Sequence, residues 1–225
     1  MNGLLLIDKP AGISSFGVVA RVRWLLSQQA GKKVKVGHTG TLDPFATGLM
    51  IIVVGEYCKR AGEFSKLDKT YEATLRLGAT STTGDPEGDI IAGSDRQPTE
   101  PEIQSALEKF RGEITQTPPS YSAIKIDGVR AYKLARAGKT VEMPTRQVMI
   151  HTLELMKYQY PEAIIRTHVG SGTYIRTLAE DIGRELNTGA YLTQLRRTVV
   201  GEYDIADAIA LDVVDESIAQ RLIEV

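Results

Sequence analysis

Residues 37–48 read GHTGTLDPFATG, and this glycine-punctuated stretch leads directly into the apolar run from Leu49 to Val54. Three glycines within twelve residues let the backbone turn tightly and approach a partner closely. Asp43 precedes Pro44, which biases the aspartate towards extended backbone. The stretch predicts a carboxylate on a rigid turn beside a buried strand, an arrangement that suits nucleophilic or acid–base chemistry. Spacing alone leaves open a second interpretation, in which Asp43 only organises the turn.

Apolar spacing on both sides of this loop predicts strands with interspersed helices. We expect strands at residues 3–7, 49–54, 71–77, 148–158, 163–169 and 192–200. We expect two helices that begin after residue 15 and after residue 99, and two more at residues 131–137 and 173–186. Thr99 with Glu102 forms a capping-box pattern, and Thr173 is the expected cap of the last of these helices. The order has no regular strand–helix–strand alternation, which favours an α+β fold.

Charge is unevenly distributed along the 225 residues, although the net charge is only −1. Residues 1–60 and 121–200 each carry a balance of +5, whereas 61–120 carry −5 and 201–225 carry −6. If the two basic blocks converge in space, they form a footprint for phosphates. The alternative is that both blocks are ordinary solvated faces.

The composition argues against disulfide bonds, metal sites and a membrane location. A single cysteine, Cys58, excludes an internal disulfide and a multi-cysteine metal site, and the three histidines have no metal-ligand spacing. No apolar run reaches the roughly 20 residues of a membrane span, and the N-terminus lacks the features of a secretory signal. We therefore expect a cytosolic protein without metal or membrane contact.

The run GHTGTLDPFATGLM at residues 37–50 resembles the catalytic motif of the TruB family of pseudouridine synthases. Four further stretches resemble motifs of that family in the same order, from about residue 2 to residue 205. They are KPAGISS at 9–15, KTYEA at 69–73, SGTYIRT at 171–177 and QLRRT at 194–198. The resemblance implies an α+β pseudouridine synthase fold, with a mixed, largely antiparallel sheet flanked by helices.

The resemblance also implies a domain layout. Residues 1–210 would form the catalytic domain, with 125–146 as a thumb-like region that contacts RNA. Residues 211–225 would be a short acidic tail, without the full C-terminal RNA-binding domain of typical bacterial members.

By the same resemblance, Asp43 is the catalytic residue for isomerising the uridine at position 55 of the tRNA T-loop, and neither cofactor nor metal is needed. Attack on ribose C1′, attack on base C6 and a glycal route all remain open. Arg176 is the expected partner that keeps this carboxylate ionised, since a surface arginine would be poorly placed in the first turn of a helix. Tyr71 would lie against the flipped uracil, although a core tyrosine is the simpler interpretation of its strand pattern.

Other residues are expected to bind the RNA. Tyr174 and Leu195 correspond to family positions that line the uracil pocket, and either could equally be a packing residue. His38 matches the family histidine that contacts the RNA loop once the base is extruded. Contacts with the RNA backbone are expected from nine cations: Lys9, Lys32, Lys33, Lys35, Lys125, Arg130, Lys133, Arg196 and Arg197.

The expected partner is the tRNA T-arm, bound by a monomer without a protein partner. Two other functions compete with this one. The first is an RNA-binding helper that opens and re-anneals tRNA independently of catalysis. The second is a pseudouridine synthase for another RNA, which fits less well because other families differ around the aspartate. A small-molecule nucleoside enzyme would not require two basic blocks.

Overall fold

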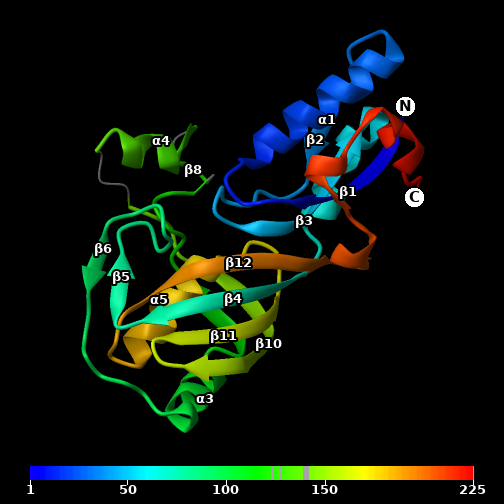
Figure 1. The fold of residues 1–225 in the computed structure, drawn as a ribbon. Helices are drawn as coiled ribbons and strands as arrows, with labels where there is room; N and C mark the ends of the chain where they lie inside the picture. The colour runs from blue at the N-terminus through cyan, green and yellow to red at the C-terminus, as the bar shows by residue number, and fades with distance from the viewer. Residues whose placement is uncertain (123, 127, 139–141, 225) are drawn as a thin grey trace. The chain divides into compact units, whose positions relative to one another are not determined.

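The computed structural model describes residues 1–122, 124–126, 128–138 and 142–224 (Figure 1). The chain divides into two compact units, one formed by residues 1–72 and 195–225 and the other by residues 73–194. Among the residues that the structure describes, ten strands join in one mixed sheet, so the expected α+β class is confirmed. Within the described residues, no helix is both long and apolar enough to cross a membrane.

The first unit is built on β1 (Gly3–Lys9) and β3 (Thr47–Val54), which pair antiparallel along their length. Their almost continuous burial explains why both sequences are apolar runs and not alternating patterns. Strand β2 (Val36–His38) lies antiparallel on the other edge of β3, and β14 (Ile209–Ala210) lies parallel to β1.

Helix α1 (Ser15–Ala30) follows β1 and begins as its sequence predicts. The side chain of Ser14 caps it by accepting from the Gly17 N–H, and Gly31 ends it in the left-handed conformation with φ of 62°. The remaining elements of this unit are η1 (Gly55–Arg60), α2 (Ala61–Ser65), β13 (Tyr203–Asp204), η2 (Ile205–Asp207), η3 (Leu211–Val213) and η4 (Glu216–Arg221).

The core of this unit gathers side chains from β1, β3, α2 and the end of β12. It contains Leu4, Leu6, Leu49, Ile51, Val53, Phe64 and Val200. The acidic segment after residue 210 is also anchored, because Leu211, Val214 and Ile218 are buried and Ile223 bridges Leu4.

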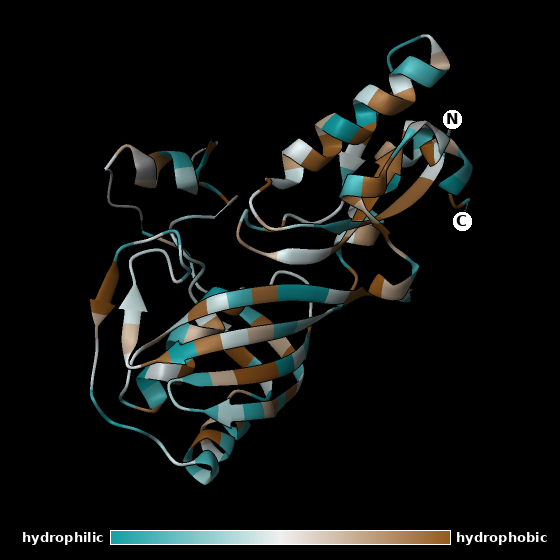
Figure 2. Ribbon diagram, viewed as in Figure 1, coloured by the Kyte–Doolittle hydropathy of each residue, from teal (hydrophilic) through white to brown (hydrophobic). Residues whose placement is uncertain are grey.

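The second unit contains the antiparallel strands β11 (Glu162–Val169), β10 (Arg146–Gln159) and β7 (Gly112–Gln116). Two longer strands, β4 (Lys69–Leu77) and β12 (Ala190–Val200), contribute residues to both units. In Figure 2 the strands β4, β11 and β12 change colour from residue to residue, as expected for strands with one face in the core.

Helices α3 (Glu100–Glu108) and α5 (Ile175–Glu185) belong to the second unit. The capping box of Thr99 and Glu102 is confirmed. The prediction that Thr173 caps α5 is wrong, because the N-cap residue is Tyr174 and the Thr173 hydroxyl donates instead to Gly170 O at 2.8 Å.

Two short hairpins complete this unit. They are β5 (Ala79–Ser81) with β6 (Ile90–Ala92), and β8 (Lys125–Ile126) with β9 (Val129–Arg130), the latter followed by α4 (Ala131–Arg136). The second hairpin and α4 fall in the expected thumb-like region 125–146, of which residues 127 and 139–141 lie outside the described part of the chain.

Candidate active site

Asp43 lies in a loop that carries no regular structure between β2 and β3. The Ala46 N–H donates to Asp43 O at 3.1 Å and closes a turn at Pro44. Leu42 on one side and Ala46 on the other are buried, whereas Asp43 is only partly buried. The loop therefore anchors its apolar side chains in the first unit and leaves the carboxylate at the surface of that unit.

Ser15 ties the start of α1 to this loop. Its hydroxyl donates to Leu42 O and accepts from the Leu42 N–H, each at 2.8 Å, and Ser15 is only 3 % exposed. Both main-chain groups of the residue before Asp43 are thus satisfied by one side chain.

Lys9 and Gly12 hold the other side of the turn. The Lys9 ammonium donates to Pro10 O at 2.9 Å, to Ile13 O at 2.8 Å and to Pro44 O at 3.2 Å, and the Gly12 N–H also donates to Pro44 O. Lys9 is fully buried. The expectation that Lys9 contacts an RNA phosphate therefore needs correction, since its donors are directed at carbonyls of the protein.

Arg197, on β12, stabilises the Asp43 loop. Its Nε donates to Leu49 O at 2.7 Å and its Nη2 to Gly40 O at 3.1 Å, and the residue is 2 % exposed. The backbone of Arg197 pairs with Gly48, where φ is 110° and a Cβ would lie 2.3 Å from Arg197 O. Only glycine fits at position 48. The expectation that Arg197 contacts an RNA phosphate needs the same correction as that for Lys9, because its donors are also directed at carbonyls of the protein.

Arg196 is placed differently from its neighbour. It forms a two-pronged pair with the Asp8 carboxylate at 3.1 and 2.7 Å, and its side chain remains 40 % exposed. Lys32, Lys33 and Lys35 are exposed in the segment between α1 and β2. These four residues remain accessible to a polyanion.

His38 ends β2 opposite Ile52 and is partly buried. Tyr71 and Leu195, on β4 and β12, are each 8 % exposed. All three belong to the first unit, as does Asp43, and their roles in binding uracil stay predictions.

Arg176 belongs to the second unit and is buried, which overturns the interpretation of a surface arginine. Its Nη1 lies 3.2 Å from Asp85 Oδ2 and donates to Thr83 O at 2.8 Å, and its Nη2 donates to Tyr121 O at 2.8 Å. The Asp85 carboxylate also accepts from the Thr83 hydroxyl at 2.5 Å. The pairing of Arg176 with Asp43 stays a prediction, because the two residues belong to different units.

The loop that contains Asp85 approaches α5 closely. At Gly84, φ is 73° and a Cβ would meet Glu180 Oε1 at 2.6 Å. Burial raises the pKa of the Glu180 carboxyl, and the Arg176 guanidinium opposes that rise. Asp85 was not among the residues predicted from the sequence, although the glycine beside it marks a position where the backbone must approach another element.

A polar cavity of about 550 Å³ opens beside this arginine within the second unit. Thr83 and Tyr121, whose carbonyls accept from Arg176, line it together with Thr117, Thr177 and Glu180. Its walls thus combine hydroxyls with a carboxyl group.

Tyr174 precedes α5 and is oriented by its main chain and its ring. Its N–H donates to Gln116 Oε1 at 2.9 Å, its carbonyl accepts from Gln116 Nε2 at 3.0 Å, and the Arg146 guanidinium lies 4.7 Å from its ring centroid. Lys125, Arg130 and Lys133 are exposed on the β8–β9 hairpin and α4, so their expected contacts with RNA stay predictions.

Comparison with solved structures identifies chains with a similar fold. A chain in a structure described as a Cbf5–Nop10–Gar1 complex matches with a TM-score of 0.69 and 27% identity, over 93% of this chain and 52% of that one. A chain from an H/ACA RNP bound to a substrate RNA containing 2′-deoxyuridine matches with a TM-score of 0.68 and 25% identity, over 93% and 51%. This chain spans about half the length of those structural relatives.

Sequence comparisons are more specific. The model of the TruB family pseudouridylate synthase N-terminal domain matches residues 24–175, and that of the tRNA pseudouridylate synthase B C-terminal domain matches residues 176–222. The curated tRNA pseudouridine synthase B of Burkholderia mallei is 47% identical over 96% of this chain and 70% of its own length. That of Pseudomonas aeruginosa is 44% identical over 96% and 69%.

The fold is thus that of a pseudouridylate synthase. The chain belongs to the TruB family.

Proposed function

We propose that this chain isomerises the uridine at position 55 of the tRNA T-loop to pseudouridine, with Asp43 as the catalytic carboxylate. The observation that carries the proposal is the immobilisation of the Asp43 loop. Lys9 and Ser15, which are six residues apart, and the distant Arg197 each bond to main-chain atoms of that loop. A rearrangement at one glycosidic bond needs a carboxylate held in a fixed position, and such positioning is what these contacts supply.

The substrate follows from the relatives and from charge. Both curated relatives are named tRNA pseudouridine synthase B, and the first unit exposes Lys32, Lys33 and Lys35 close in sequence to the loop. A base stacked in a folded RNA loop must be extruded before a buried pocket can receive it. His38, at the end of β2, is proposed to contact the opened loop. The proposal includes the cytosolic site of action expected for tRNA maturation.

In the second unit, Arg176 is proposed to supply positive charge to the reacting groups. Its guanidinium is already fixed by Asp85 and two carbonyls, so it would not need to reorganise when RNA binds. Tyr71, Tyr174 and Leu195 are proposed to form the walls of the uracil pocket.

The test is pseudouridine mapping on an unmodified tRNA transcript, with the native chain and Asp43→Asn side by side. We expect new pseudouridine at the T-loop uridine with the native chain only, while both proteins bind the transcript. Modification at another position would keep the enzyme class and overturn the substrate. Binding without any modification would favour the RNA-folding helper.

A further inference from the structure

Helix α1 exposes two large aromatic side chains on its outer surface. Phe16 is 66 % exposed and Trp24 is 61 % exposed, and exposed Ala20 lies between them at four-residue spacing. Residues four apart share one side of a helix, so these three form a stripe. The stripe spans about 12 Å along the helix axis. We name Phe16, Ala20 and Trp24 the α1 stripe.

The stripe begins at the Asp43 loop. Phe16 follows Ser15, whose hydroxyl makes both bonds to Leu42, one residue before Asp43. Phe16, the first residue of the stripe, thus follows directly in sequence the residue that bonds to this loop.

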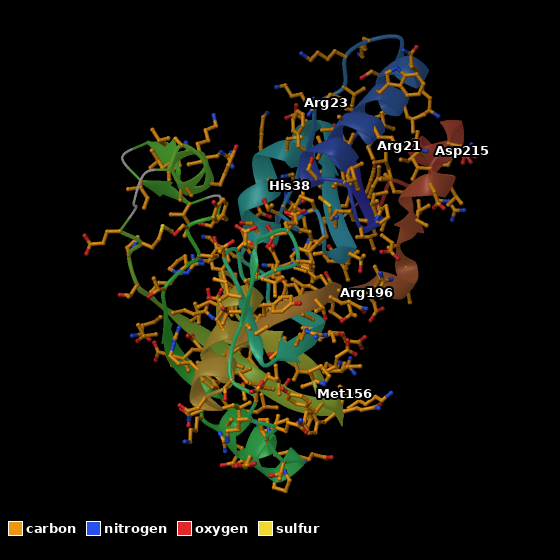
Figure 3. All side chains as sticks on the ribbon, turned by 60° about the vertical axis from the view of Figure 1, so that its left-hand side comes forward. Arg21, Arg23, His38, Met156, Arg196 and Asp215 are labelled. Carbon is orange, nitrogen blue, oxygen red and sulfur yellow. The ribbon has the colours of Figure 1, made fainter. Side chains whose placement is uncertain are left out.

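Arg23 connects the stripe to the strand that carries His38. Its guanidinium lies 5.8 Å from the centroid of the Phe16 ring, and its Nη2 donates to Val36 O at 3.2 Å. Val36 and His38 are the two ends of β2, and alternate residues of a strand face the same side. Figure 3 shows Arg23 on α1 and His38 on β2.

The surroundings of the stripe are basic. From residue 10 to residue 55 the sequence contains five Lys/Arg and one acidic residue, Asp43 itself. Helix α1 has no acidic residue, and exposed Lys32 and Lys33 follow its end. The acidic C-terminal segment meets the helix through Arg21, which donates to Asp212 O at 3.5 Å and lies about 60° around the helix from Trp24 and about 160° from Arg23.

Exposed aromatic rings within a basic surface suit one ligand chemistry. Unpaired nucleobases stack on aromatic side chains while cations hold the phosphates, and this combination recurs in proteins that bind single-stranded RNA. We propose that the α1 stripe is a stacking platform for unpaired bases of the substrate RNA next to the extruded uridine. The inference rests on the proposed function, since it takes the RNA of that reaction as ligand.

Trp24 is the only tryptophan in the chain, so its emission reports on the stripe alone. The experiment titrates the full chain, carrying Asp43→Asn to prevent turnover, with an unmodified tRNA transcript. Binding is followed in parallel by the anisotropy of a labelled transcript. We expect Trp24 emission to be quenched with the same midpoint as the anisotropy, because a base stacked on indole quenches it. Unchanged emission at saturating RNA would overturn the platform.

Substitutions in the α1 stripe distinguish stacking of RNA bases on the aromatic rings from mere proximity of the RNA to Trp24. Phe16→Ala and Trp24→Ala should each raise the Kd for the transcript by about tenfold, the effect of losing one base–aromatic stack. Trp24→Phe keeps a ring and should restore most of the affinity. The matched control is Met156→Ala, because Met156 is 54 % exposed in the second unit, and it should leave the Kd unchanged (Figure 3). Unaltered Kd values for both aromatic variants would contradict the proposal.

A second occupant is tested in the same samples. If another copy of the chain covered the stripe, Trp24 emission would change with protein concentration in the absence of RNA, and this would overturn the proposal. Isomerisation is measured separately on the chain that retains Asp43. Quenching without any isomerisation would reject the proposed function and keep the stacking platform. Isomerisation without quenching would keep the proposed function and reject the stacking platform.

Discussion

Ser15 and Leu42 are joined by two hydrogen bonds of 2.8 Å, in which one hydroxyl both donates to and accepts from the same residue's main chain. The two residues are 27 positions apart in sequence. The contact fixes the backbone one residue before Asp43, so the placement of that carboxylate depends on the start of α1.

Replacing Ser15 by alanine tests this dependence. Ser15→Ala would leave the Leu42 N–H and C=O buried without their partner, at a cost of about 1–3 kcal/mol in the free energy of unfolding. We expect kcat on a tRNA transcript to fall at least tenfold because Asp43 loses its fixed position. Ser14→Ala is the control, since it removes the α1 cap for about 1 kcal/mol and should spare kcat. Equal kcat values for the two variants would argue against a positioning role.

Neighbouring arginines on β12 should differ sharply in their effect on stability. Arg197→Lys loses the fork that spans Leu49 O and Gly40 O inside the first unit, so we expect about 2–3 kcal/mol of destabilisation in urea unfolding. Arg196→Lys weakens a pair with Asp8 that is partly exposed, and should cost less than about 1 kcal/mol. The reverse order would mean that Arg197 does not brace the loop.

The buried pair of Asp85 and Arg176 should be sensitive to the loss of its negative charge. Asp85→Asn removes a buried carboxylate that lies 3.2 Å from the buried Arg176 guanidinium, and we expect a loss of about 3–5 kcal/mol in the free energy of unfolding. Asp181→Asn is the matched control, because burial already raises the pKa of the Asp181 carboxyl and its partner Arg184 is exposed. A similar small effect for both substitutions would show that the Arg176 charge is compensated by other groups.

Lys69 should give the stability of the protein a distinctive pH dependence. Burial, with a further contribution from the Arg197 charge, lowers the pKa of Lys69 to about 8, from about 10.4 in an unfolded chain. Between these two values the unfolded chain binds the proton and the folded one does not. The free energy of unfolding therefore rises as the pH increases from 8 towards 10, and this contribution is constant below pH 8.

Urea unfolding of the native chain and Lys69→Met across pH 7 to 10 isolates this contribution. We expect the rise in the native chain to be absent from the variant. The Lys69 ammonium donates to Ser65 O at 2.8 Å and to Leu67 O, so the variant must first be shown to fold by its circular dichroism. Parallel pH curves would mean that Lys69 titrates near its usual value.

The class of fold, the main strands and helices, and the loop that carries Asp43 could all be predicted from sequence patterns. Local signals were sufficient there, because the Ser14 cap, the Thr99–Glu102 capping box and the apolar runs of β1 and β3 act over a few residues.

Which charged residues are buried could not be predicted from the sequence and became clear only from the folded chain. Lys9 and Arg197 were predicted from the sequence to contact phosphates, but both are buried and donate to distant carbonyls of the protein, Lys9 to Pro44 O and Arg197 to Gly40 O. Asp85 acquires its importance in the same way, through Arg176, which is 91 residues away. Burial of a charge depends on partners supplied by other elements, and local sequence patterns do not contain that information.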